Sequence, residues 1–434
     1  MIFRLILSLI LTLSVASAGA LELSLADCRE LALLNDEDLK IAQNRVKEAK
    51  YDKGIAQSAF FPKFDINGGA FYLTPDASMG SSMEIQMRGV YMAGISLTQP
   101  IFTGGKIITG NKLANIGREA SEQQLEAARM DVLAEAEKSY WMYVAVLSKI
   151  DMINAYITQL DSIFEYTRSA YEVGLTTALN VNRVESRRSE LAYRLKQARS
   201  GADLCRMALC RIIGVGENEN IIPTETLEID TRPESQFFGI ENRPELKLAR
   251  MNIDVKKLEV RMARADLLPL IGMQLGWNAF GNMKMTSYTP LPDGTMYPFT
   301  QSIDYRGFVG AISVSIPVFH WGEGYKKVKK AKLEVENASL SLEKSRKLME
   351  LQAQQSYHNF IDGYDLISSA SKALNEAQSN LESVTEQYQV GLMTLTDLLE
   401  AQAQWHTSFS NLIEAKTQFK INEVEYLRNT GQLN

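Results

Sequence analysis

The chain contains Gln99-Pro-Ile-Phe-Thr-Gly-Gly105 and, 217 positions later (316 minus 99), Ile316-Pro-Val-Phe-His-Trp-Gly322. At the same offset, Tyr171-Glu-Val-Gly-Leu-Thr-Thr177 recurs as Tyr388-Gln-Val-Gly-Leu-Met-Thr394. Two motifs that recur in the same order and at the same spacing indicate a tandem duplication, which must be recognised before a fold is assigned. We therefore expect two equivalent units within one chain.

The first twenty residues have the composition of a secretory signal peptide. Arg4 precedes an apolar run at 5–15, and small residues ending at Ala18 or Ala20 offer two cleavage sites. The run is too short to span a membrane as a helix, although an uncleaved N-terminal anchor is the alternative interpretation. Residues 1–20 are therefore predicted to direct export.

The remaining chain divides into two predicted repeats, 21–214 and 242–434, joined by an irregular segment at 215–241. Each repeat is expected to run in the order helix, strand, loop, strand, very long helix, tight turn, helix. The first helix is expected at about Leu25–Phe60, with Asp27 as its N-cap.

Alternation of apolar and polar residues predicts strands at about 63–73, 90–99, 270–281 and 305–316. It places Phe64, Ile66, Ile95, Leu97, Ile271, Met273, Leu275 and Trp277 on one face, and Asp65, Asn67, Ser96, Thr98, Gln274 and Asn278 on the other. Strands of about ten residues fit a transmembrane barrel, with lipid outside and water inside. A soluble sheet with one solvated face gives the same alternation. The signal peptide and the aromatic residues near the strand ends favour the membrane.

Helical patterns of about 65 residues follow Gly105 and Gly322, and each would span roughly 100 Å. Their apolar residues, and those of the returning helices, recur every three to four positions, which predicts coiled-coil packing. In the first long helix this predicted core stripe comprises Tyr143, Val146, Ile150, Ile153, Ile157, Leu160, Phe164, Thr167 and Tyr171.

Composition argues against several functions. A net charge of -6 argues against nucleic acid as a partner. The histidines, His320, His358 and His406, show no ligand spacing for a metal, so we expect no metal site, no cofactor and no enzymatic activity. Three cysteines are too few for a disulfide framework, although one bridge from Cys28 to Cys205 or Cys210 remains open.

Taken together, the two strand-to-helix junctions and the two hairpin tips resemble the outer-membrane efflux protein family of TolC-like channels. The resemblance covers essentially the whole mature chain. At the junctions, a proline removes a strand hydrogen-bond donor and a glycine lets the chain turn into the helix. The junction residues are Pro100, Gly104, Gly105, Pro317 and Gly322.

The resemblance implies a mixed α/β membrane protein that forms a homotrimer. Four strands per chain would give a twelve-stranded barrel in the outer membrane of a Gram-negative bacterium, and the helices would form a coiled-coil tunnel across the periplasm. The channel would be the exit duct of a tripartite efflux or type I secretion system, docked to a periplasmic adaptor and an inner-membrane pump. The alternatives are a periplasmic adaptor or structural coiled coil without a pore, and a soluble secreted helical protein.

The resemblance also implies roles for the hairpin tips. Asp397 and Glu400, three positions apart on one helix face, would form a cation-selective gate, although a solvated acidic face is the plainer interpretation. Tyr388 would hold the entrance shut, with a hydrogen bond to Asn180. Asn180 and Met393 replace charged residues of the family's prototype, so closure would depend on packing. The adaptor would dock at Val173, Gly174, Leu175, Thr176, Val390, Gly391, Leu392 and Met393.

Methionines gather in the two predicted surface loops, Leu73–Gly89 and Gly281–Asp304. Thioethers are ligands suited to Cu(I), so metal export is one hypothesis; plain sequence variation in loops is the other. The residues are Met79, Met83, Met87, Met283, Met285 and Met296.

Overall fold

The protein is described from a computed structural model, which describes residues 21–79, 82–229, 232, 237–292 and 294–433. The predicted signal peptide, and part of the predicted joining segment, lie outside the described residues. The chain is mostly helical and divides into two compact units. A helical unit comprises the described residues up to Asn44, with Glu122–Leu248 and Glu343–Asn434; a second unit comprises Arg45–Ser121 and Ala249–Leu342.

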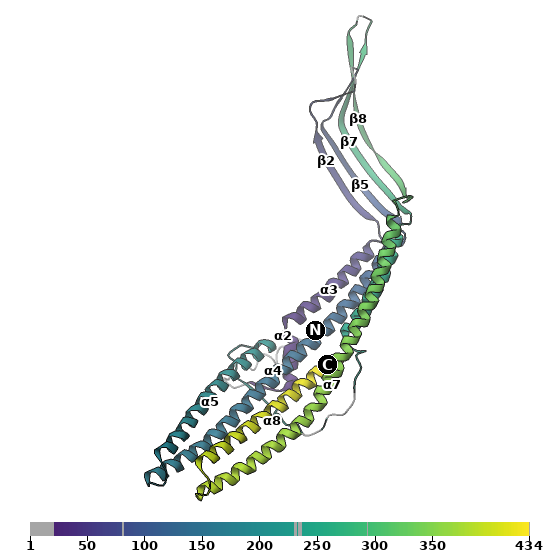
Figure 1. Cartoon of the computed structure of the whole chain (residues 1–434). Helices are drawn as coiled ribbons and strands as arrows, with labels where there is room; N and C mark the ends of the chain where they lie inside the picture. Colours follow the sequence, from purple (N-terminus) through teal and green to yellow (C-terminus); the bar gives the residue numbers. More distant parts are fainter. Residues whose placement is uncertain (1–20, 80–81, 230–231, 233–236, 293, 434) are drawn as a thin grey trace, which may run out of the picture. The chain divides into compact units, whose positions relative to one another are not determined.

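Two antiparallel hairpins of long helices dominate the helical unit (Figure 1). Helix α4 (Lys106–Glu172) and helix α7 (Glu323–Gln389) each have 67 residues, and each begins in the second unit. The returning helices, α5 (Ala178–Ile213) and α8 (Leu395–Thr430), each have 36 residues. The two hairpins therefore match in length, helix for helix.

The tight turns of the two hairpins have the same hydrogen bonds. In the first, Gly174 N donates to Tyr171 O and Leu175 N to Ala170 O; in the second, Gly391 N donates to Tyr388 O, and Leu392 N to Gln387 O. Gly174 and Gly391 have φ angles of 81° and 80°, a left-handed conformation that glycine adopts without the clash of a Cβ atom. Glycine at these two positions therefore ends each long helix.

Facing apolar stripes form the core between the hairpins, as the three-to-four spacing predicts. One buried cluster joins α4, α5, α7 and α8 and includes Tyr156, Leu160, Val184, Leu191, Leu398 and Trp405. The rings of Tyr156 and Trp405 meet edge to face at 6.3 Å. Each large apolar side chain buried in this way contributes roughly 1.5–3 kcal/mol.

The N-terminal helix is broken where one helix was expected. Helix α2 (Leu25–Asn35) ends before Asp36, and α3 (Glu37–Ser58) continues after it. The N-cap of α2 is Ser24 rather than Asp27, because the Ser24 hydroxyl accepts a hydrogen bond from Asp27 N at 3.1 Å. The Asp27 carboxylate in turn accepts one from Ser24 N at 3.3 Å. The expectation that Asp27 is the cap was therefore wrong by three positions.

The other elements that lie wholly in the helical unit are short. Helix α6 (Pro244–Ala265) begins in this unit and continues into the second. Strand β1 (Leu21–Leu23) pairs in parallel with β6 (Ile221–Pro223), which follows the first hairpin. Beside this pair lies a second buried cluster around Tyr140, Leu209 and Ile213.

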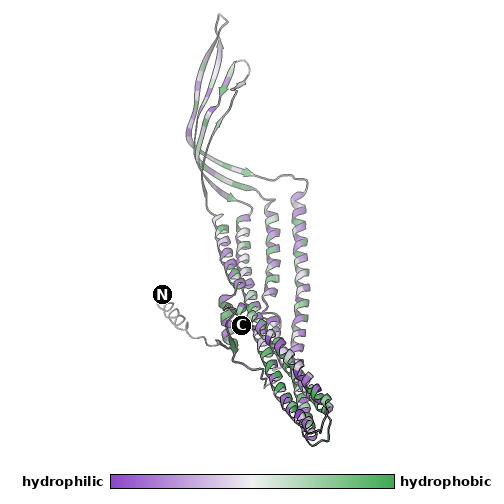
Figure 2. Ribbon diagram, turned by 90° about the vertical axis from the view of Figure 1, so that its left-hand side faces the viewer, coloured by the Kyte–Doolittle hydropathy of each residue, from purple (hydrophilic) through white to green (hydrophobic). Residues whose placement is uncertain are grey.

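The second unit carries an antiparallel sheet whose main strands run in the order β2 (Lys63–Tyr72), β5 (Arg88–Phe102), β7 (Leu270–Pro290) and β8 (Met296–Ser315). One row of direct partners crosses all four strands: Ile66, Ile95, Trp277 and Phe308. The next row contains Asp65, Ser96, Gly276 and Val309. The register thus separates the predicted apolar and polar faces on β2 and β5, while on β8 the second row contains the apolar Val309; Figure 2 shows the colours alternating along the strands.

Several predicted strand limits were wrong. Most of the predicted loop Gly281–Asp304 is strand, because β7 and β8 stay paired from Met283↔Ile303 to Pro290↔Met296 and only 291–295 connect them. Within the first predicted loop, β3 (Ala77–Met79) pairs with β4 (Met83–Gln86), and β4 pairs with β7. Of the six methionines assigned to loops, all but Met87 therefore belong to strands.

Pro100 also lies inside a strand rather than at its end. It pairs with Gly272, and the register shifts between Pro100 and Phe102. A shift of this kind accommodates proline, because the regular ladder is already interrupted there.

Three further observations concern the described part of the chain. Cys28, Cys205 and Cys210 are free thiols, so the bridge left open above is not formed. Among the described helices, none combines the length and the apolarity needed to cross a membrane. The described residues include no group of three or more His, Cys, Asp or Glu side chains arranged to hold a metal ion.

Candidate gate at the hairpin tips

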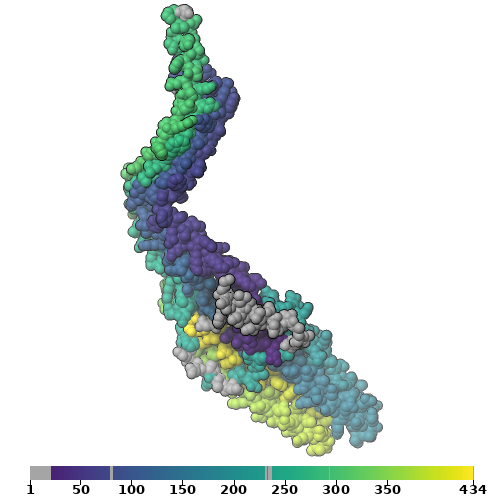
Figure 3. Space-filling model, turned by 180° about the vertical axis from the view of Figure 1, so that it is seen from behind, coloured from purple at the N-terminus to yellow at the C-terminus, as the bar shows by residue number. Residues whose placement is uncertain are grey.

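Both hairpin tips lie at the same end of the helical unit (Figures 1 and 3). Each tip presents apolar side chains to solvent: Leu175 is 83% exposed and Leu392 is 75% exposed. Val173 and Val390 are similarly exposed. Exposed apolar groups clustered at one end of a helical unit are typical of a surface that binds another protein.

Tyr388 joins the two hairpins through Thr167, not through Asn180. The hydroxyls of Tyr388 and Thr167 lie 3.3 Å apart, and Thr167 is fully buried. The Asn180 amide instead donates to Thr176 Oγ1 at 2.9 Å, within its own hairpin. The expected Tyr388–Asn180 bond is therefore replaced by a bond between α7 and α4.

Tyr166 strengthens the same link. Its hydroxyl donates to Gln389 O at 3.2 Å, and its ring meets the Tyr388 ring edge to face at 5.6 Å. Tyr166 was not identified from the sequence, because it lies just outside the apolar stripe. Thr167 was placed in that stripe, and a buried threonine among apolar residues was the available signal that it has a polar partner.

Asp397 caps α8. The Thr394 hydroxyl donates to Asp397 Oδ2 at 2.6 Å, Thr394 N donates to the same oxygen at 3.0 Å, and Asp397 N donates to Thr394 Oγ1 at 3.2 Å. These bonds stabilise the carboxylate, and the Thr394 hydroxyl above all lowers the pKa of Asp397. In the single chain, Asp397 is therefore anchored and ionised, while Glu400 is exposed one turn further along the helix.

Two arginines fix the neighbouring helices. Arg183 Nη1 donates to Thr396 Oγ1 at 3.2 Å and so connects α5 to the start of α8. Arg188 Nε donates to Asp161 at 2.8 Å, and its guanidinium lies 4.4 Å from the centroid of the Phe164 ring. Met393 adds no charge to this end and is partly exposed.

The strand-to-helix junctions belong to the second unit, whereas the tips belong to the helical unit. Gly105 and Gly322 directly precede α4 and α7, and Pro317 follows the end of β8. At the start of α4, Lys106 Nζ forms an ion pair with Asp266 at 2.6 Å.

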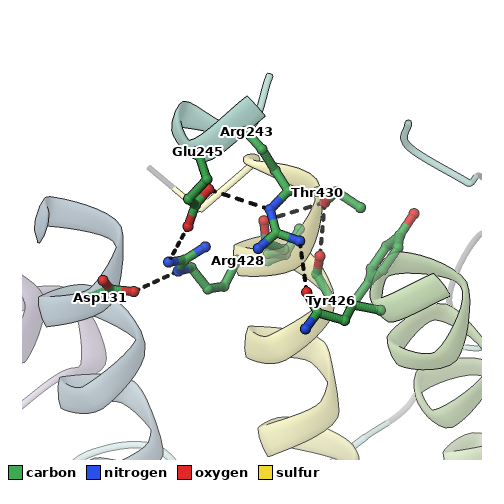
Figure 4. A network of polar contacts seen from close by, with 8 residues as sticks. Asp131, Arg243, Glu245, Tyr426, Arg428 and Thr430 are labelled. Atoms are coloured by element: carbon green, nitrogen blue, oxygen red, sulfur yellow. Dashed lines mark hydrogen bonds and ion pairs between the residues drawn. The ribbon is translucent and has the colours of Figure 1, made fainter. Parts of the chain in front are cut away.

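A polar network ties the C-terminal end of α8 to other segments of the helical unit (Figure 4). Arg428 forms ion pairs with Asp131 of α4 and Glu245 of α6, each at 2.6 Å. Arg243 contacts Glu245 at 3.4 Å and Gln352 of α7 at 3.2 Å. No pattern in the sequence pointed to this network, because its members are far apart along the chain.

Comparison with known proteins agrees with this arrangement. A model of the outer membrane efflux protein family matches residues 28–214 and 240–432. The chain is 23% identical over 355 residues to outer membrane protein TolC of Escherichia coli (strain K12), covering 79% of this chain and 69% of that protein. It is 20% identical over 411 residues to alkaline protease secretion protein AprF of Pseudomonas aeruginosa, covering 92% and 82%.

The fold has a close match among solved structures. The crystal structure of the Campylobacter jejuni CmeC outer membrane channel superposes with a TM-score of 0.78 at 18% sequence identity, covering 94% of this chain and 85% of that one.

Proposed function

Since the chain belongs to the outer membrane efflux protein family, it is an outer-membrane exit duct of an efflux or secretion system, and we propose that three copies form the complete channel. Each copy would contribute β2, β5, β7 and β8 to a twelve-stranded barrel in the membrane. The helical hairpins of the three copies would together enclose the periplasmic tunnel.

The observation that carries this proposal is the open sheet. Strands β2 and β8 each pair on one side only within the described residues, and the apolar face has no helix packed on it: Ile66 is 81% exposed and Phe308 is 87% exposed. Unpaired edges and an uncovered apolar face are unstable in water. Closing the sheet with two further copies satisfies the edges, and lipid covers the apolar face.

The tips have the chemistry of a gate and of a docking surface. Tyr388 and Thr167 hold α7 against α4, while Asp397 and Glu400 supply negative charge beside the turn. Three copies would bring six carboxylates around the entrance and favour cations there. The exposed side chains of Leu175 and Leu392 would receive a periplasmic adaptor, which in turn joins an inner-membrane pump.

The family and one relative suggest two pump classes. AprF is named for the secretion of alkaline protease, so a type I secretion pump is one partner class for this chain; the family is named for efflux, so an efflux pump is the other. We assign no catalytic reaction to the protein, because an exit duct needs none.

Single-channel recording tests the proposal. The purified protein in a planar lipid bilayer should give discrete, cation-selective conductance steps. Asp397→Ala/Glu400→Ala should reduce the selectivity, while Glu343→Ala/Glu350→Ala, which removes two carboxylates of α7 away from the tip, should leave it unchanged. Folded protein that gives no conductance would instead favour an adaptor or a structural coiled coil. If Asp397→Ala/Glu400→Ala left the cation selectivity of the steps unchanged, the protein would still be a channel, but these two residues would not form its gate.

A further inference from the structure

Strands β7 and β8 are longer than a membrane crossing requires. They have 21 and 20 residues, whereas a tilted transmembrane strand needs roughly 9–11. Their far halves remain paired as far as Pro290↔Met296, and Figure 1 shows them extending beyond β2 and β5. The halves nearest the helices are long enough to cross the lipid, so the far halves project outside it.

The two faces of β8 exchange their character near Gly307, since successive residues of a strand point to opposite faces. The lipid face carries the apolar Val314, Ile312 and Phe308 and then continues with the polar residues Arg306, Asp304, Ser302 and Thr300. The channel face begins with the mostly small residues Ser315, Ser313, Ala311, Val309 and Gly307 and continues with the larger Tyr305, Ile303, Gln301, Phe299 and Tyr297. Beyond Gly307, the outward side is therefore polar and the channel side is mostly apolar.

A bulge makes β7 follow the same exchange. Phe280 pairs with Tyr305 and Met283 pairs with Ile303, so β7 has one residue more than β8 between these two pairs. The extra residue reverses the alternation along β7. Met283 and Met285 therefore point to the channel side with Ile303, instead of to the lipid side.

Asn282 holds this bulge in place. Its φ angle is 66°, a left-handed conformation that asparagine tolerates better than most residues do. Its backbone N donates to Asp304 Oδ1 at 3.0 Å, and its side-chain amide donates to Gly89 O at 3.1 Å. Specific hydrogen bonds thus build the change of face into β7.

Strand β4 extends the apolar surface on the channel side. Its Ile85 pairs with Met285, and Met83, two positions away, lies on the same face. On the reverse side, the hydroxyls of Thr286 and Thr300 lie 2.9 Å apart, a contact suited to water. We call the apolar surface the mouth face; it comprises Met83, Ile85, Met283, Met285, Phe299 and Ile303.

We propose that the mouth faces of three copies meet on the channel axis and constrict its outer end. In the trimer and barrel proposed above, on which this depends, the mouth face of every copy turns toward the same axis. Phe299 is 61% exposed in the single chain, so the mouth face gains stability where a second copy covers it. Lipid is not the partner, because the far halves of the strands present their polar side outward. Methionine suits such a contact, since its flexible side chain packs against irregular surfaces.

Cysteine cross-linking in the intact purified protein tests this contact. Met285→Cys, on the mouth face, should give linked chains on a denaturing gel after treatment with a short bis-maleimide. Thr286→Cys, at the next position on the reverse side, is the matched control and should stay unlinked. The wild type sets the background from its free thiols Cys28, Cys205 and Cys210. Equal linking of the two variants, or linking of neither, overturns the proposal.

Channel recording gives a second test of the constriction. Phe299→Ser/Ile303→Ser should enlarge the conductance steps, because the apolar contact that narrows the mouth is lost. Thr300→Ala/Ser302→Ala, on the reverse side of the same strand, should leave the steps unchanged. Steps of wild-type size in the first variant would contradict the constriction.

The native mass of the protein without cross-linker keeps this constriction and the proposed exit duct apart. A trimer that conducts, yet shows no link at Met285→Cys, remains an exit duct whose mouth faces do not meet. A monomeric native mass would refute the trimer and the constriction together.

Discussion

Arg428 and Asp131 lie 297 positions apart in the chain, yet Arg428 Nε donates to Asp131 Oδ1 at 2.6 Å. The same guanidinium reaches Glu245 at 2.6 Å, so one side chain holds the end of α8 against α4 and α6. The Arg428 side chain is only 18% exposed; Glu245 is 28% exposed and Asp131 60%, so the contact with Glu245 is the better shielded from water.

Arg428→Met should therefore destabilise the helical unit by about 1–3 kcal/mol, because charge-assisted hydrogen bonds are lost and the partly buried Glu245 keeps only its longer contact with Arg243. Urea unfolding followed by circular dichroism measures the change. Arg346→Met, which removes an exposed ion pair with Glu350, is the matched control and should cost under about 1 kcal/mol. Equal losses in the two variants would contradict a special role for Arg428.

The same contact predicts a pH dependence. Burial raises the pKa of Glu245, but its own backbone N–H and the charge of Arg428 outweigh burial and leave that pKa below its ordinary value of 4.5. A lowered folded-state pKa contributes stability above pH 4.5, and the contribution disappears as the pH falls through the folded-state value. The difference in the free energy of unfolding between wild type and Arg428→Met should therefore become smaller as the pH falls. A difference that stays constant with pH would show that the ionisation of Glu245 does not contribute to it.

Tyr388→Phe should make the entrance easier to open, because the hydroxyl contact with Thr167 is lost. We expect larger or more frequent conductance steps in lipid bilayers. Thr167→Val should have a similar effect, and the double variant should add little to either single change, since both remove one bond. Tyr171→Phe, at the exposed tip, is the control. Fully additive effects would show that Tyr388 and Thr167 act separately.

Asp397 and Glu400 should behave differently when neutralised. Asp397→Ala removes the carboxylate that completes the capping box of α8 and should lower the Tm as well as the cation selectivity. Glu400→Gln should lower the cation selectivity and leave the Tm unchanged, because the capping box of α8 is formed by Thr394 and Asp397 and does not include Glu400. Reversal potentials across a salt gradient and thermal unfolding together separate the two. A Tm unchanged by Asp397→Ala would contradict the capping role.

Phe308→Arg should block accumulation of the protein in the outer membrane. A cationic side chain on the lipid face of a barrel strand costs about 2–4 kcal/mol at the bilayer midplane. Ala311→Arg, three positions away on the opposite face of β8, would point to the barrel interior and should be tolerated. Membrane fractionation compares the two, and equal loss of both would argue against the assignment of the faces.

Cys28 should resist thiol reagents in the folded protein. Burial, with a smaller contribution from Glu137, raises its pKa to about 12, so almost no thiolate forms near neutral pH. Maleimide should label Cys28 only after unfolding. Rapid labelling of Cys28 in the native state would contradict its buried position.

The helices and the faces of the sheet followed from the sequence because a single period governs each. The 3.5-residue repeat through Ile153 and Leu160 predicts a helix stripe, and the alternation at Phe64 and Ile66 predicts a strand face. The Ser24 cap was also available, since Ser-x-x-Asp before an apolar run is a capping-box signature.

Other features depend on contacts between distant segments. Tyr388 was paired with Asn180, yet its partner is Thr167, which lies 221 positions away. The long β7–β8 hairpin was mistaken for a loop, because its proline, glycine and threonine content is typical of loops. Cross-strand pairing, such as Met283 with Ile303, decides this conformation rather than local composition.

The unpaired edges of β2 and β8 have a genetic consequence. In the proposed trimer, each edge is completed by a neighbouring copy. One chain with a damaged sheet therefore inactivates the trimer that it forms with two wild-type chains. Alleles that disrupt the edges but spare the helical unit should therefore be dominant over the wild-type gene. Alleles that abolish folding of the helical unit should be recessive, because such chains never enter the assembly.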